Sequence, residues 1–249
     1  MTLETFNLIC VIWSAVAVAT FFLLQFVTAP YGRHVTAGWG AQIANRTGWI
    51  LMELPSFLII LYFYLTANQS IYAAFLSLLW LFHYVNRTFI FPFRIRTKGK
   101  KMPLAIVFSA VFFNFFNAGL NGYFLANFET YTAANFTTWN FILGGTLFAL
   151  GFMFNQISDS ILINLRKPGE TGYKIPKGFL FEYISCPNLF SEFIQWSGFA
   201  LMAWNFPATT FLIWTAANLF PRALKHHKWY LSHFKEYPKN RKAVIPWLW

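Results

Sequence analysis

Long apolar stretches recur along this chain and constrain its fold more than any other feature. Most are about 17–22 residues long and nearly free of charge, which is the length at which a helix crosses the hydrocarbon of a bilayer. Charged residues make up 11% of the chain, against roughly 25% in soluble domains. We therefore predict an all-α integral membrane protein, a single membrane domain over 1–249, with about seven transmembrane helices at 6–27, 49–66, 71–92, 103–125, 139–157, 190–205 and 207–221.

The last two windows are short, and the sequence between them leaves two interpretations open. The segment AWNFPATT surrounds Pro207. A proline there either follows a tight turn between two helices or kinks one longer helix. Seven spans is the prediction, and six is the alternative.

The basic residues indicate how the helices are oriented. With seven spans, the segments 28–48, 93–102, 158–189 and the tail from 222 fall on one side, and they carry 18 of the 19 Lys and Arg residues, Arg33 and Lys98 among them. Cytoplasmic loops are enriched in Lys and Arg, so we predict an N-terminus outside and a cytoplasmic C-terminus. Attraction to anionic lipid explains many of these charges equally well, and nothing resembles a nucleic-acid-binding fold.

On the same predicted side, polar side chains repeat every four residues, so that they share helix faces. Such a face offers donors, acceptors and charge to a large polar ligand, and guanidinium groups bind phosphate in a bidentate manner. The alternative is that these groups cap helix ends and pair with one another, for example Asp159 with Arg166. The repeating residues are Asn155 with Asp159, Asn188 with Glu192, and Arg222 with His226 and Tyr230. The last set follows Pro221, which is expected to be the first residue of a helical segment.

Two other kinds of site are not supported. GWGAQI, which opens at Gly38, is close to a dinucleotide-binding GxGxxG, but no strand–helix–strand unit surrounds it. His226, His227 and His233 lack the spacing of a helical zinc site. We predict no metal.

A few ionisable residues lie inside the predicted spans. Glu53 is in the second, and the third contains HYVNRTF with His83, Tyr84 and Arg87. A charge at bilayer depth costs about 3 kcal/mol on insertion scales, so these groups favour a functional pocket. The alternative is that Glu53 is buried without a functional role and pairs with Arg87 or His83.

Two segments resemble the steroid 5α-reductase (3-oxo-5α-steroid 4-dehydrogenase) family. They are NLRKPGETGYKIPKGFLFEYISCPNLFSE at 164–192 and RALKHHKWYLSHFKEYPKNRKAVIPWLW at 222–249, with its KxRKAxIP pattern. HYVNRTF and LMELPS, around Tyr84 and Glu53, are similar to the family as well. The resemblance covers roughly residues 48–249.

The resemblance implies an NADPH-dependent reduction of the Δ4 double bond of 3-oxo steroids within a membrane. It implies catalytic roles for Glu53 and Tyr84, in helices at 49–92, and substrate-pocket walls at Trp49 and Trp196. Glu182 receives no role. The implied NADPH contacts, mostly within 155–249, are Arg87, Asn155, Asp159, Arg166, Tyr173, Asn188, Glu192, Arg222, His226, Tyr230 and Arg241.

Several rival functions stay open from the sequence. A trans-2-enoyl-CoA reductase or a polyprenol reductase would share the chemistry, and an isoprenylcysteine-type membrane methyltransferase would place its cofactor similarly. A transporter would bind no nucleotide. The expected location is the inner membrane of a bacterium or the endoplasmic reticulum of a eukaryote, in contact with membrane lipid.

Overall fold

A computed structural model describes residues 1–28, 39–97, 99–167, 170 and 172–249. Arg33, Lys98 and Gly38, which entered the sequence arguments, lie outside these residues. Within the described chain, each predicted span corresponds to helix. The long helices are α1 (Leu3–Phe26), α2 (Asn45–Thr66), α3 (Ile71–Val85), α5 (Leu104–Asn127), α6 (Trp139–Asn164), α7 (Pro187–Ala203) and α8 (Phe206–His233).

Five helical stretches are both long and apolar enough to cross a membrane. They are α1, α2, the stretch Ile71–Arg94, α5 and α6. These helices support a multi-pass membrane protein. Seven spans and the predicted orientation of the termini stay predictions.

The third predicted span is not a uniform helix. After α3 the chain forms a π-helical turn, η2 (Asn86–Ile90), and then a short helix, α4 (Phe91–Arg94). Such π-turns insert a residue into a helix and occur often at functional sites. The turn contains Arg87.

The structure resolves the ambiguity at Pro207. Trp204 ends α7 in a left-handed conformation with φ 43°, and the Asn205 side chain caps α8 by accepting from the backbone N–H of Ala208. Pro207 lies in the first turn of α8, where its missing N–H costs nothing. A tight turn between two helices is therefore correct. The expectation that Pro221 begins a helical segment is wrong, because α8 runs through it.

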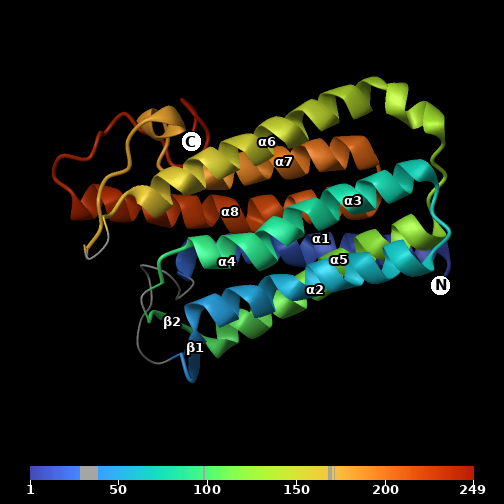
Figure 1. The fold of residues 1–249 in the computed structure, drawn as a ribbon, viewed down its shortest axis with the longest axis horizontal. Helices are drawn as coiled ribbons and strands as arrows, with labels where there is room; N and C mark the ends of the chain where they lie inside the picture. The colour runs from blue at the N-terminus through green and yellow to red at the C-terminus, as the bar shows by residue number, and fades with distance from the viewer. Residues whose placement is uncertain (29–38, 98, 168–169, 171) are drawn as a thin grey trace.

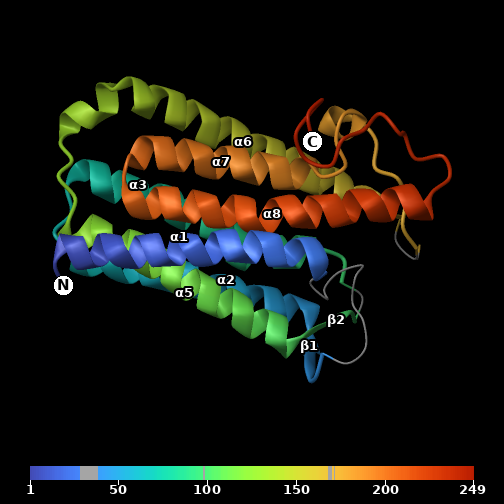
Figure 2. The ribbon, with the colours of Figure 1, turned by 180° about the vertical axis from the view of Figure 1, so that it is seen from behind.

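The helices run side by side in one bundle, as Figure 1 shows, with α1 lying across the back of that view and the front of Figure 2. The pairs α2 and α5, α6 and α7, and α1 and α8 pack along their lengths. The connections on the predicted cytoplasmic side lie at the end opposite the N-terminus, next to the C-terminal tail (Figure 1). The small elements are β1 (Gln42–Ala44), which pairs antiparallel with β2 (Lys101–Pro103), η3 (Ala133–Thr137) and η4 (Phe179–Glu182).

Glycines allow α6 and α7 to approach closely. A Cβ on Gly198 would lie 2.4 Å from the carbonyl oxygen of Gly144, and one on Gly151 would lie 2.4 Å from the backbone nitrogen of Gln195. Small residues at such crossings let membrane helices pack backbone to backbone. This contact sets α7 beside α6 and thereby brings the polar faces of both helices together.

Candidate functional site

Side chains from α2, α3 and α5 meet in the middle of the bundle around one buried asparagine. The Tyr84 hydroxyl donates to Oδ1 of Asn114 at 3.4 Å, and the Ser56 hydroxyl donates to the same oxygen at 3.0 Å. Nδ2 of Asn114 donates to the Met52 carbonyl oxygen at 2.6 Å and to Oε2 of Glu53 at 3.4 Å. The two residues predicted to be catalytic are therefore linked through Asn114.

Aromatic rings surround Tyr84. Trp80 stacks on it at 5.5 Å between ring centroids, and Trp196 of α7 lies 6.1 Å away. Trp196 also packs against His83 at 4.6 Å, and His83 is hydrogen-bonded to Gln195 at 3.2 Å. Tyr84 thus presents a polar hydroxyl from an otherwise apolar wall.

Arg87 connects this region to the polar faces of α6 and α7. Its guanidinium lies 3.7 Å from Asp159 and 3.8 Å from Glu192. The same group lies over the rings of Trp49 at 5.0 Å and Phe91 at 4.7 Å. The two carboxylates and the two aromatic faces hold this cation in place.

These contacts correct one alternative taken from the sequence and bear on a second. Asp159 pairs with Arg87 rather than with Arg166, whose guanidinium donates to the Gly172 carbonyl oxygen at 3.1 Å. Among the described residues Glu53 forms no ion pair within 4 Å, but the charge of Arg87 acts on it from a greater distance.

The polar pairs on α6 and α7 face one another as their spacing suggested. Nδ2 of Asn155 donates to the Asn188 carbonyl oxygen at 2.9 Å. Glu192 lies one turn after Asn188, and Trp196 one turn after Glu192. One face of α7 therefore runs from the polar cluster to the aromatic wall beside Tyr84.

The C-terminal tail packs around Arg241, which is 2% exposed. Its guanidinium donates to the Pro176 carbonyl oxygen at 2.9 Å and lies 3.6 Å from the carboxylate of Glu182. A parallel bridge between Ile184 and Lys242 attaches the tail to the segment before α7. Sequence reasoning gave Glu182 no role, and the structure makes it the ion-pair partner of Arg241.

A second polar contact supports the same tail. The Ser185 hydroxyl forms hydrogen bonds of 2.6 Å with Nδ1 of His227 and with the Tyr237 hydroxyl. Burial raises the pKa of Tyr237, so its hydroxyl stays protonated at neutral pH. Tyr237 also stacks on Tyr230 at 5.0 Å, which holds the end of α8 against the tail.

The remaining predicted residues lie around this end of the bundle. Tyr173 packs against Trp229 at 4.9 Å, with the Arg166 guanidinium 5.9 Å and the Lys100 ammonium 5.7 Å from its ring. Arg222, His226 and Tyr230 follow one another at one-turn spacing on α8. Cationic, amide and aromatic groups therefore line the same end as Arg241.

Some buried polar atoms at this end could bind a ligand. Oδ2 of Asp159 and Nε of Arg241 have no hydrogen-bond partner in the described part of the chain. Buried polar groups are normally hydrogen-bonded. Oδ2 of Asp159 still lies 3.7 Å from Nη1 of Arg87, so it is ion-paired without being hydrogen-bonded. An acceptor and a donor with hydrogen bonds to spare, beside several arginines, fit a ligand with hydroxyl and phosphate groups such as a nucleotide.

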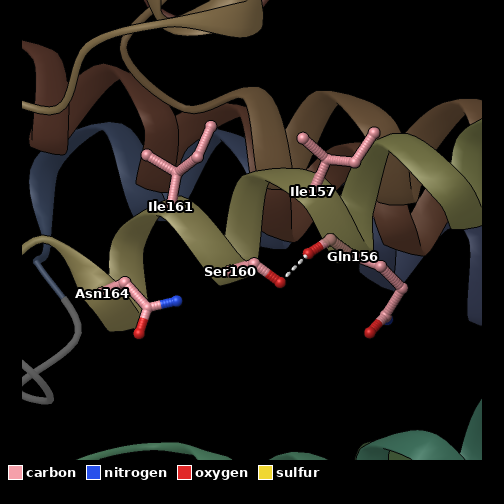
Figure 3. Close-up of a pocket in the computed structure, with 5 residues that line it drawn as sticks. All are labelled: Gln156, Ile157, Ser160, Ile161 and Asn164. Atoms are coloured by element: carbon pink, nitrogen blue, oxygen red, sulfur yellow. Dashed lines mark hydrogen bonds between the residues drawn. The ribbon is translucent and has the colours of Figure 1, made fainter.

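A shallow groove of about 470 Å³ lies elsewhere, on the face of α6 lined by Gln156, Ile157, Ser160, Ile161 and Asn164 (Figure 3). Arg94 donates across it to Gln156 at 2.6 Å and to Ser160 at 2.8 Å. None of the residues predicted to be catalytic lines it. In the described residues no group of three or more His, Cys, Asp or Glu side chains could hold a metal ion.

Sequence reasoning missed Asn114, Ser56 and Gln195. All three are buried polar residues in apolar helices, and polar residues at membrane depth are a functional signal. Asn114 shares α5 with Asn117 and Asn121, also buried, so spacing alone could not distinguish the one that reaches Tyr84.

Comparisons with known proteins agree on one family. A sequence model described as 3-oxo-5-alpha-steroid 4-dehydrogenase matches residues 100–249. The steroid 5-alpha-reductase DET2 of Solanum lycopersicum is 42% identical over 250 residues, covering 98% of this chain and 97% of that protein. The 3-oxo-5-alpha-steroid 4-dehydrogenase 1 of Bos taurus is 40% identical over 240 residues, covering 94% and 93%. The protein of the same name from Homo sapiens is 39% identical over 238 residues, covering 94% and 92%.

Proposed function

The chain belongs to the 3-oxo-5-alpha-steroid 4-dehydrogenase (steroid 5-alpha-reductase) family, and on that premise we propose that it reduces the Δ4 double bond of 3-oxo steroids with NADPH, using Tyr84 and Glu53. It is an oxidoreductase that acts on a CH–CH group. The observation that carries the proposed site is the buried Tyr84 hydroxyl, linked to Glu53 through Asn114 at the end of an aromatic wall.

Tyr84 and Glu53 suit the charge that this reaction develops. A bound reduced nicotinamide would supply the hydride, and C5 of the steroid would accept it. Negative charge then moves to the 3-oxo oxygen as the enolate forms, and a donor aimed at that oxygen stabilises the transition state more than the ground state. The Tyr84 O–H is that donor, with the Glu53 carboxyl as a second donor or as an orienting group. Protonation at C4 completes the product.

The steroid would lie against apolar and aromatic side chains. Trp196 packs beside Tyr84, and Trp49 lies one helical turn before Glu53 on the same face of α2. Flat rings of this kind match the flat fused rings of a steroid. Both tryptophans are proposed walls of the substrate pocket.

The nucleotide would lie toward the C-terminal end, where Oδ2 of Asp159 and Nε of Arg241 have no hydrogen-bond partner in the described part of the chain. Arg166 and Arg241 would bind its phosphates, and the amides of Asn155 and Asn188 would bind its carboxamide or ribose groups. The other residues proposed to hold NADPH are Arg87, Tyr173, Glu192, Arg222, His226 and Tyr230.

We also propose how the protein is oriented and in which membrane it lies. The single membrane domain over 1–249 has its N-terminus outside and its nucleotide-binding end in the cytoplasm, where NADPH is available. The membrane is the inner membrane in a bacterium or the endoplasmic reticulum in a eukaryote, and surrounding lipid delivers the steroid.

One experiment tests both the cofactor and the substrate. Detergent-purified protein is heated with NADPH, NADH or S-adenosylmethionine, because ligand binding to the native state raises stability, by about 2.7 kcal/mol at 100 times Kd. NADPH oxidation is then followed with progesterone, a trans-2-enoyl-CoA and a polyprenol. We expect a thermal shift with NADPH and product formation from progesterone. Stabilisation by S-adenosylmethionine alone, or turnover of only the enoyl-CoA or the polyprenol, would contradict the proposal.

A further inference from the structure

We propose that Asn114 is a positioning residue for the reaction, setting the direction of the Tyr84 hydroxyl and coupling it to Glu53. The inference rests on the proposed function, because it assumes that Tyr84 and Glu53 act on the substrate. It adds a residue of α5 to a site otherwise attributed to α2 and α3.

The hydrogen bonds leave the Asn114 amide one orientation. The Met52 carbonyl oxygen can only accept, so the atom 2.6 Å from it must be the amide nitrogen. The amide oxygen then faces Ser56 and Tyr84, at 3.0 and 3.4 Å. Asn114 is 4% exposed, so no competing solvent reorients it.

This orientation determines where the Tyr84 proton points. An amide oxygen can only accept, so in the contact with Asn114 the Tyr84 O–H is the donor. The 3.4 Å separation is long for a bond between two oxygens, which normally lie 2.5–3.0 Å apart. The proton is therefore directed without being held tightly, and a ketone oxygen can take over as its acceptor.

The amide nitrogen of Asn114 also determines which oxygen of Glu53 accepts a hydrogen bond. Nδ2 only donates, and it faces Oε2 at 3.4 Å. Oε2 is therefore the acceptor in this contact, which favours Oε1 as the site of a proton on Glu53. Since Glu53 is hydrogen-bonded to Asn114 and Tyr84 to the same amide, Glu53 orients Tyr84 through Asn114 rather than directly.

α5 offers a matched control. Asn117 is also buried, at 1% exposure, and its side chain accepts from the Trp13 indole at 3.2 Å and donates to the Phe113 carbonyl oxygen at 2.8 Å. It has no hydrogen bond to Glu53 or Tyr84 in the described structure. Replacing Asn117 removes a buried amide of the same helix but leaves the proposed site intact.

The test is a double-mutant cycle on purified enzyme, with kcat, KM for NADPH and melting temperature measured for each variant. Its members are Asn114→Ala, Tyr84→Phe, both together, and Asn117→Ala. We expect Asn114→Ala to lower kcat tenfold or more, up to about 100-fold, as misplaced catalytic groups do, with KM for NADPH unchanged. Added to Tyr84→Phe, it should cost less than about threefold further. Asn117→Ala should lower the melting temperature but keep kcat.

The results distinguish a failure of this inference from a failure of the proposed function. A kcat of Asn114→Ala equal to that of Asn117→Ala, with Tyr84→Phe nearly inactive, would overturn this inference alone. Independent, multiplying losses in the double variant would also overturn it. Near-native turnover by Tyr84→Phe would instead contradict the proposed function. If Asn114→Ala does not fold, Ser56→Ala replaces it: removing the 3.0 Å bond should lower kcat several-fold, and an unchanged kcat would overturn the inference.

Discussion

Arg87 of the π-helical turn forms an ion pair with Asp159 of α6, with 3.7 Å between Nη1 and Oδ2. The pair joins the helices that carry Glu53 and Tyr84 to the helices proposed to bind NADPH. Both side chains are largely buried, at 12% and 5% exposure. The relative position of the two halves of the site therefore depends on a charge contact shielded from solvent.

Replacing Arg87 with Met should destabilise the protein by about 3–5 kcal/mol, because Asp159 and Glu192 would be left as unpaired buried charges. Adding Asp159→Asn should recover part of this loss, as expected for directly coupled residues. Unfolding in denaturant measures both effects. Arg46→Met is the control, since Arg46 is exposed and loses only a hydrogen bond to the Pro92 carbonyl oxygen and a contact with the Phe93 ring, which should cost no more than about 1.5 kcal/mol. Equal effects at the two arginines would contradict the buried pair.

Glu53→Gln and Tyr84→Phe should each lower kcat by about 10²–10³, the usual cost of losing one donor to a developing oxyanion. NADPH should still raise the melting temperature of both variants. Tyr72→Phe is a matched control on α3, because the Tyr72 hydroxyl is also buried and donates to the Met202 carbonyl oxygen at 2.8 Å. It should lose about 1 kcal/mol of stability and keep its kcat. Near-native rates from both site variants would refute their assignment.

Arg241→Ala and Arg166→Ala should reduce the preference for NADPH over NADH. A hydrogen bond to a charged group contributes about 1.5–3 kcal/mol, so KM for NADPH should rise about tenfold or more while KM for NADH changes little. Steady-state assays with both nucleotides measure the ratio. Lys239→Ala, an exposed cation two residues before Arg241, should leave the ratio unchanged. An unaltered ratio in both arginine variants would exclude them as phosphate ligands.

Gly198→Ala should destabilise the protein by about 1–3 kcal/mol, the typical cost of overpacking, because the new methyl group would lie 2.4 Å from backbone atoms of Gly144 and Phe148. Thermal unfolding of the detergent-solubilised protein measures it. Gly145→Ala is the control, since its methyl group would meet only Met202 Sδ at an ordinary 3.7 Å. That change should be neutral or stabilising by up to about 1 kcal/mol from helix propensity. A destabilised Gly145→Ala with an unaffected Gly198→Ala would contradict the packing of α6 on α7.

The helices themselves could be predicted well from the sequence. Apolar windows located every long helix, because bilayer thickness and the helical rise set the length of such a window. Their ends were less predictable: α6 extends to Asn164 rather than stopping near 157, and α8 passes Pro221 to His233. These extensions mix polar and charged residues with apolar ones, so hydropathy marks only where a continuous apolar stretch ends and does not show where a helix ends.

Local periodicity also identified side chains that share a face, such as Asn155 with Asp159 and Asn188 with Glu192, since one helical turn brings them together whatever surrounds the helix. Tertiary structure alone decided which faces meet. The close crossing at Gly144 and Gly198 sets α7 on α6, and helix packing brings Arg87 to Asp159 and Asn114 between Tyr84 and Glu53. These partners are 30 or more residues apart in the chain, and their contact depends on side-chain packing between helices, which the periodicity of a single helix does not encode.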